Sequence, residues 1–96
     1  TQKVTAQDPQ EGSQFGRSLD VSGDQLLIGA PIADGQDGAV YLFDRAGFVF
    51  SQNQKFSVPA NSNGQMGNDV AISGEVLISG SWRENGSTGI LYLHQP

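Results

Sequence analysis

Apolar side chains in this chain follow the two-residue spacing of β-strands. Residues 18–22 alternate strictly between polar and apolar side chains, and residues 69–73 repeat the alternation in the same phase. This pattern is typical of a strand with two unlike faces. Residues 26–28 and 39–43 are continuous apolar runs, which indicate central strands covered on both sides. No longer stretch has the helical period of about 3.6 residues, so the sequence predicts an all-β fold with essentially no helix.

The sequence contains an internal repeat of two units. A shift of 51 positions places residues 15–45 on residues 66–96 with nine identities. Every glycine of the second half has a counterpart in the first half once one residue is inserted in the early loop. Retained glycines indicate backbone constraints, because only glycine adopts positive φ freely or tolerates a close backbone approach. We therefore expect two units, residues 1–50 and 51–96, each a four-stranded antiparallel meander.

The outer strand of each unit is expected to come first in the chain. Residues 48–58 form a more polar strand-like segment, and a shift of 52 places Gln2-Lys3 on Gln54-Lys55. Residues 2–6 are therefore the expected outer strand of the first unit. The final expected strand, residues 90–94, is then left without an outer neighbour.

Three segments of the first unit carry a family resemblance: residues 15–19, 23–31 and 38–43. Together they resemble the FG-GAP repeat, the blade motif of the integrin α-subunit β-propeller and of many bacterial and some fungal secreted proteins. The second unit departs from this motif, with Met66 in place of phenylalanine, residues 79–82 in place of Gly-Ala-Pro, and His94 in place of the second aromatic. The resemblance implies propeller blades and a secreted or cell-surface location.

Two blades do not close a propeller, because closed rings have about four to eight. We expect a cyclic homo-oligomer, a trimer with six blades or a tetramer with eight. Residues 2–6 of one copy would complete the last sheet of the next by strand exchange. The alternative is that these two blades belong to a longer propeller.

Composition narrows the function classes. The net charge of −5 argues against a nucleic-acid partner, which requires a basic face. The longest run without polar side chains has eight residues, against about 20 for a membrane span. The chain has no cysteine, and His94 is its only imidazole, without a recognisable Ser-His-Asp grouping. We therefore expect a protein that is not an enzyme.

Calcium is the cofactor that the resemblance raises, because FG-GAP repeats of the integrin kind often carry an Asp-rich loop. The connection at residues 22–25 is too short to wrap an ion. Asp34 and Asp37 are the candidate metal ligands, since they lie three apart in a glycine-rich loop between central strands. The alternative is a solvated turn, because calcium requires six or more oxygens.

The candidate ligand-binding residues follow a strand of the second unit. They are Trp82, Arg83, Glu84 and Asn85. The Trp82 ring could stack on a sugar while its neighbours hydrogen-bond the hydroxyl groups, or it could pack between blades. We expect a non-enzymatic binding module with a glycan or protein ligand, lectin-like or active in cell-surface adhesion through multivalent sites. The alternative is a structural building block, a fragment or a designed assembly unit, with no ligand of its own.

Overall fold

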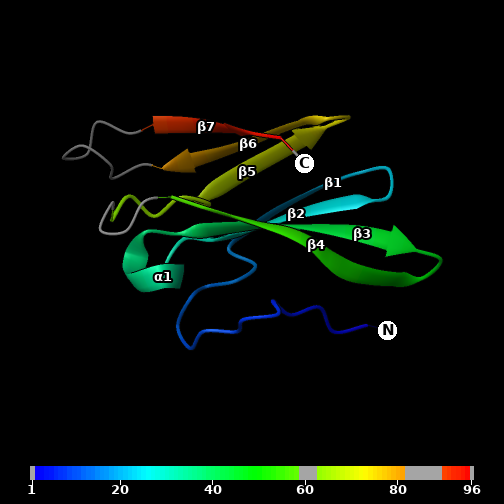
Figure 1. The fold of residues 1–96 in the computed structure, drawn as a ribbon, viewed down its shortest axis with the longest axis horizontal. Helices are drawn as coiled ribbons and strands as arrows, with labels where there is room; N and C mark the ends of the chain where they lie inside the picture. The colour runs from blue at the N-terminus through cyan, green and yellow to red at the C-terminus, as the bar shows by residue number, and fades with distance from the viewer. Residues whose placement is uncertain (1, 59–62, 82–89, 96) are drawn as a thin grey trace.

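The protein is built from two antiparallel β-sheets that lie one above the other (Figure 1). The computed structural model describes residues 2–58, 63–81 and 90–95. The first sheet contains β1 (Ser18–Ser22), β2 (Gln25–Ala30), β3 (Ala39–Ala46) and β4 (Val49–Ser57), and the second contains β5 (Asp69–Ser73), β6 (Val76–Ser81) and β7 (Ile90–His94). The all-β class is confirmed. In the described residues the second sheet has three strands, where four were expected.

The strands lie where the apolar pattern of the sequence predicts them. In β1 the burial alternates, but the apolar residues Leu19 and Val21 are the exposed ones and the polar residues between them are half-buried. β3 begins with five consecutive buried residues, because both of its faces are covered. Gly23 and Gly74 close the β1–β2 and β5–β6 hairpins with φ angles of 58° and 57°, in the left-handed region that glycine adopts without strain.

The connection between β2 and β3 holds one short turn, α1 (Ala33–Gln36), where the sequence predicted no helix. Asp34 and Gly35 have φ angles of 54° and 69°, so this segment is a compact turn and not a regular helix. Its first residue, Ala33, is buried and anchors the turn to the core. No helix in the described parts of the chain is long and apolar enough to span a membrane.

The sequence repeat is also a repeat of backbone geometry. Gly16 and Gly67 are counterparts, and both have a φ angle of 94°. The amide of Gly16 donates to the carbonyl of Gly29 at 3.1 Å, and the amide of Gly67 donates to the carbonyl of Gly80 at 3.0 Å. Equivalent glycines therefore make equivalent contacts in the two units.

One apolar cluster joins the two sheets. Leu27, Val40 and Leu42 project from one side of the first sheet, which we call its joint face, and all three are fully buried. They pack against Ile72 and Leu77 of the second sheet. Each such side chain contributes about 1.5–3 kcal/mol on full burial, so the two sheets form one folded unit.

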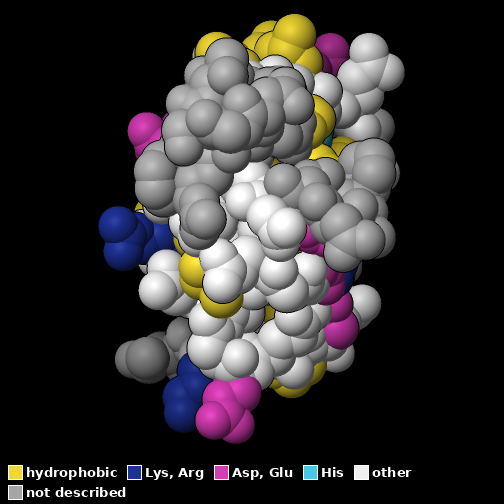
Figure 2. All heavy atoms as spheres, turned by 90° about the vertical axis from the view of Figure 1, so that its left-hand side faces the viewer, with side chains coloured by type: hydrophobic (Ala, Val, Ile, Leu, Met, Phe, Trp, Pro, Cys, Tyr) yellow, Lys and Arg dark blue, Asp and Glu magenta, His cyan; other side chains and the backbone are white. Residues whose placement is uncertain are grey.

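The far side of the second sheet is exposed. Ile78, Leu91 and Leu93 project from it, and we call it the open face. Leu91 and Leu93 are 74% and 76% exposed. Figure 2 shows hydrophobic side chains at the top of the molecule, on the side where the second sheet lies. In the repeat, these three residues are the counterparts of the three joint-face residues.

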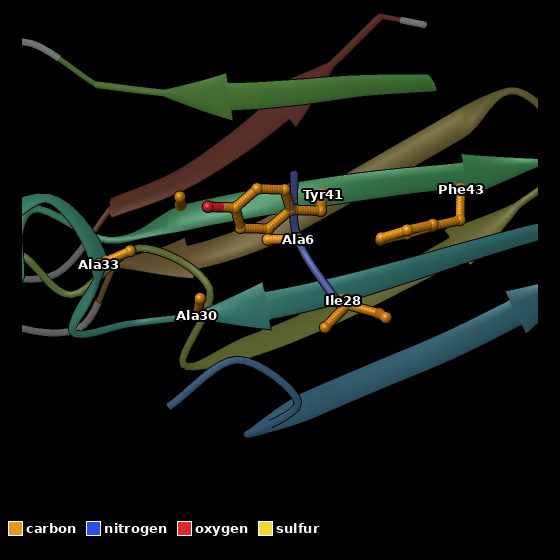
Figure 3. Close-up of a cluster of buried hydrophobic side chains, with 7 residues drawn as sticks. Ala6, Ile28, Ala30, Ala33, Tyr41 and Phe43 are labelled. Carbon is orange, nitrogen blue, oxygen red and sulfur yellow. The ribbon is translucent and has the colours of Figure 1, made fainter. Parts of the chain in front are cut away.

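The other side of the first sheet, which we call the covered face, lies under the N-terminal segment. Ile28, Tyr41 and Phe43 project from it, and Ala6 packs over them (Figure 3). Ala6 is 8% exposed. The N-terminal segment therefore contributes to the core of the first sheet.

In the single chain, residues 2–6 form no strand, where the sequence predicted an outer one. Their exchange into the last sheet of another copy stays a prediction. These residues cross the covered face, where the backbone groups of the sheet already pair with one another and offer no ladder partner. The Gln2 side chain instead exchanges two hydrogen bonds of 2.9 Å with the backbone of Phe50. The fourth strand of the first sheet is β4, which extends across the expected boundary at residue 50. The division into units at that residue stays a prediction.

Candidate functional site

The candidate ligand-binding residues Trp82, Arg83, Glu84 and Asn85 lie outside the described residues. The strand before them, β6, ends at the buried Ser81, at the same end of the molecule as α1 (Figure 1). Their assignment to ligand binding stays a prediction.

The two candidate calcium ligands have protein partners. Oδ1 of Asp34 accepts hydrogen bonds from Nε2 of Gln10 at 2.8 Å and from Nζ of Lys55 at 3.2 Å. Asp37 is 6% exposed, and its Oδ1 accepts from the amide of Asn63 at 2.8 Å. Within the described residues, no three acidic, histidine or cysteine side chains converge on a point that could hold an ion. Calcium binding by Asp34 and Asp37 stays a prediction.

A cluster of charged and aromatic side chains ties the N-terminal segment to the first sheet. Nζ of Lys55 lies 2.6 Å from Oδ2 of Asp8 and 3.2 Å from Oδ1 of Asp34. Tyr41 lies opposite Lys55 in the β3–β4 register, and its hydroxyl donates to Oδ1 of Asp8 at 3.1 Å. We call these four residues the Lys55 cluster. They come from four separate parts of the chain, so no local sequence motif marks them.

The contacts of the Lys55 cluster shift three pKa values. The hydrogen bond from Lys55 lowers the pKa of Asp8. Burial raises the pKa of Tyr41 to about 12, and the hydrogen bond to Asp8 acts in the same direction. Burial alone would lower the pKa of Lys55, but hydrogen bonds to Asp8 and Asp34 outweigh it and raise that pKa. At neutral pH Lys55 is a cation and Tyr41 a neutral phenol, so neither is suited to act as a base or nucleophile.

A small pocket lies between the N-terminal segment and the covered face. Its volume is about 120 Å³, and it is lined by Thr5, Ala6, Asp8, Pro9, Gln10, Ser13, Phe15 and Tyr41. The Phe15 ring packs edge-on against Tyr41, with the ring centroids 5.3 Å apart. Binding pockets for small molecules usually measure about 300–1,000 Å³, so this pocket has room for only a few atoms. We interpret it as a seam between two packed parts of the chain.

A second polar contact lies in the second sheet. Oγ of Ser79 and Nε2 of His94 are 2.7 Å apart, and the His94 ring lies against Phe56 of β4 with centroids 4.6 Å apart. Burial lowers the pKa of His94, so the ring is neutral at pH 7. Ser79 is fully buried between the sheets, where a substrate cannot reach its hydroxyl. The contact is therefore suited to holding the sheets together and not to catalysis.

The glycine-rich, strand-rich first unit matches a known family. Residues 1–43 match the family model of the FG-GAP repeat. This segment of the chain is an FG-GAP repeat. The match includes β1, β2, the start of β3, and Gly16 and Gly29, whose counterparts in the second unit are Gly67 and Gly80. FG-GAP repeats form β-propeller-type modules and are typical of extracellular proteins. No curated protein matches the chain.

Proposed function

We propose that this chain is a non-enzymatic β-propeller module that acts by binding. The observation that carries the proposal is the joint between its sheets: the joint face of an FG-GAP sheet packs against a second sheet of the same repeat. In the described residues, the ionisable groups with shifted pKa values are held in structural contacts. A module of this kind works through its surface and not through a reacting group.

The ligand class that we propose is a glycan, bound at the loop between β6 and β7. Trp82 offers an apolar ring that can stack on a sugar, and Arg83 and Asn85 offer hydrogen-bond donors for its hydroxyl groups. In the sequence these residues follow Ser81, and β6 ends at Ser81 at the end of the molecule that also holds α1. Repeated weak sites of this kind gain avidity when several are held in one assembly. A secreted or cell-surface location, with a role in adhesion, fits this ligand class.

Binding to a glycan array tests this proposal. The unmodified chain should bind a defined set of glycans, and Trp82→Ala should lose at least tenfold in affinity for them. Phe48→Ala is the matched control, because Phe48 is 97% exposed on the β3–β4 turn, at the opposite end of the molecule from α1. Equal binding by Trp82→Ala and the unmodified chain would contradict the assignment of Trp82.

The second candidate function is a structural building block without a ligand. The open face favours it, because Leu91 and Leu93 are exposed on a sheet whose other side is packed. Exposed apolar patches of this kind mark sites of protein association. If the chain binds no glycan on the array but still assembles, the building-block role holds and the lectin role fails.

A further inference from the structure

We propose that the open face of the second sheet docks on the covered face of the first sheet in another copy of this chain. In the same contact, residues 2–6 of that second copy add to β7 as a fourth strand. The proposal deepens the building-block role by naming the partner, and it does not depend on glycan binding. The internal repeat of the chain supplies the evidence.

The contact that we propose between copies repeats the packing of the two sheets within one chain. Val40 and Leu42 are fully buried in it, while their counterparts Leu91 and Leu93 are 74% and 76% exposed. If Leu91 and Leu93 are to be buried as Val40 and Leu42 are, another sheet must pack on the open face. The docking sheet must present the side that is equivalent to the packed side of the second sheet, which carries Ile72 and Leu77.

The first sheet leaves part of that matching side exposed. Leu19 and Val21 of β1 are 62% and 55% exposed, on the same side as the covered face. Their counterparts in the second sheet are Val70 and Ile72, which pack in the joint. Each copy thus exposes two surfaces, the open face and the β1 part of the covered face. They are the repeat counterparts of the two surfaces that pack together in its own joint. The two exposed surfaces lie on opposite sides of the molecule, so the contact between copies is head to tail.

A glycine pair fixes where the backbones meet. In the joint, Gly29 lies against the backbone carbonyl of Gly67, with no room for a β-carbon. The counterpart of Gly29 is Gly80, whose nearest heavy atoms are 4.0 Å from a β-carbon position. A pocket of about 120 Å³ opens over it, lined by Asp69, Val70, Ala71, Ile78, Gly80 and Leu91. Gly16, the counterpart of Gly67, has the same φ angle and no neighbour around its β-carbon position, so its carbonyl is the group that fits this pocket from a second copy.

The sequence contains a segment that could pair with the outer edge of β7, namely residues 2–6. β4 completes the first sheet beside β3, and Phe56 lies opposite Val40 in that register. Residues 2–6 are the repeat counterpart of residues 54–58, which places Val4 opposite Leu91. In the described residues β7 pairs only with β6, so its outer edge is available. Main-chain pairing along an open edge is a common mode of peptide recognition.

In the single chain, residues 2–6 occupy a position that competes with their pairing to β7 of another copy. They lie on the covered face without ladder pairing, held by the two hydrogen bonds of Gln2 to Phe50 and by the burial of Ala6. Their transfer to β7 of a neighbour uncovers the face that the neighbour's second sheet needs. Docking and strand transfer therefore favour each other. With two sheets per copy, three copies give six blades and four copies give eight, both within the range of about four to eight blades in closed propellers.

Sedimentation velocity over a range of concentrations tests the docking contact. The unmodified chain should reach three or four times its mass of 10.2 kDa. Gly80→Ala should associate at least tenfold more weakly while its circular dichroism spectrum stays unchanged, because the single chain has room for the added methyl group. Phe48→Ala, which removes an exposed ring away from both faces, should associate like the unmodified chain. A mass of 10.2 kDa at every concentration, or equal association of Gly80→Ala, overturns the proposal.

Cysteine cross-linking tests the strand transfer separately, because the chain has no cysteine of its own. Val4→Cys combined with Leu91→Cys should give covalent trimers or tetramers on oxidation, since paired strands bring such residues within disulfide distance. Val4→Cys combined with Leu93→Cys is the register control and should cross-link far less. Assemblies that give no register-specific cross-link overturn the strand transfer. The glycan array is read on the same samples, so loss of sugar binding and loss of assembly are distinguished.

Discussion

Gly29 of β2 lies directly against the backbone carbonyl of Gly67, the residue that leads the chain into the second sheet. A β-carbon at Gly29 would overlap that carbonyl oxygen and lie 2.5 Å from Oγ of Ser18. Backbone atoms cannot rotate away as a flexible side chain can. The spacing of the two sheets therefore depends on the absence of a side chain at this residue.

Gly29→Ala should lower the free energy of unfolding by about 2–4 kcal/mol, because the methyl group forces the sheets apart. Gly80→Ala, the repeat counterpart, should change it by less than about 0.5 kcal/mol in the single chain. Urea denaturation at low protein concentration measures both variants. Equal stability of the two variants would contradict the close approach at Gly29.

Stability should fall in strong alkali because of Tyr41. An unfolded tyrosine loses its proton near pH 10, while the pKa of Tyr41 in the folded chain is raised to about 12. The folded state therefore holds a proton that the unfolded state has lost, and its stability declines as pH rises from about 10 to about 12. The raised pKa of Lys55 acts in the same direction.

Ultraviolet absorption of the phenolate in a Tyr92→Phe variant checks this, because Tyr41 is then the only tyrosine. The variant should titrate near pH 12 or on unfolding. Ionisation near pH 10 in the folded chain would contradict the burial of Tyr41.

The ion pair of Asp8 and Lys55 should stabilise the fold near neutral pH and lose this effect in acid. The pKa of Asp8 is lowered in the folded chain, so the stabilisation is present above its ordinary pKa of 3.8 and is lost as pH falls through the folded value. Asp8→Asn should cost about 0.5–1 kcal/mol near neutral pH, since solvent screens a carboxylate that is nearly half exposed.

The cost of Asp8→Asn should disappear at the lowest pH values, where the carboxylate of the unmodified chain is protonated. Asp24→Asn is the matched control, because its pair with Arg45 is more exposed, and it should cost less. A pH-independent cost of Asp8→Asn would show that lost packing, and not charge, explains the effect.

His94 should make the joint between the sheets sensitive to mild acid. Burial lowers its pKa below 6.5, so stability is highest above pH 6.5 and falls as the pH drops towards the folded value. His94→Phe should remove this dependence but leave the buried Ser79 hydroxyl without its partner, at about 1–3 kcal/mol.

The double variant Ser79→Ala with His94→Phe should recover part of that loss and remain insensitive to pH. Chemical denaturation at about pH 7.5 and about pH 5 measures the difference. An unchanged pH dependence in His94→Phe would assign the acid sensitivity to other groups.

The strands could be predicted because their signals are local. The alternation of residues 18–22 and the apolar run of residues 39–43 match β1 and the start of β3. Residues 2–6 resemble the end of β4 but form no strand within the single chain, because they lie across a sheet face and not beside a free strand edge. The turn α1 was missed for a similar reason: its amides are satisfied by distant groups, such as the Gln10 side chain bonded to the amide of Asp34.

The candidate site was less accessible from sequence. Asp34 was singled out by its spacing from Asp37, yet its partners in the structure are Gln10 and Lys55, which lie far away in sequence. The Lys55 cluster has no motif, since the β3–β4 register alone brings Tyr41 and Lys55 together. Long-range pairing of this kind is set by the fold and not by neighbouring residues.

Small-angle X-ray scattering of the unmodified chain tests the central claim most directly, that the two sheets are part of a larger propeller made of copies. The single chain has a Cα radius of gyration of 12.6 Å. With rising concentration, the measured radius should increase to a plateau, and the distance distribution should become that of a ring. A radius that stays at the value of the single chain at every concentration would contradict the account.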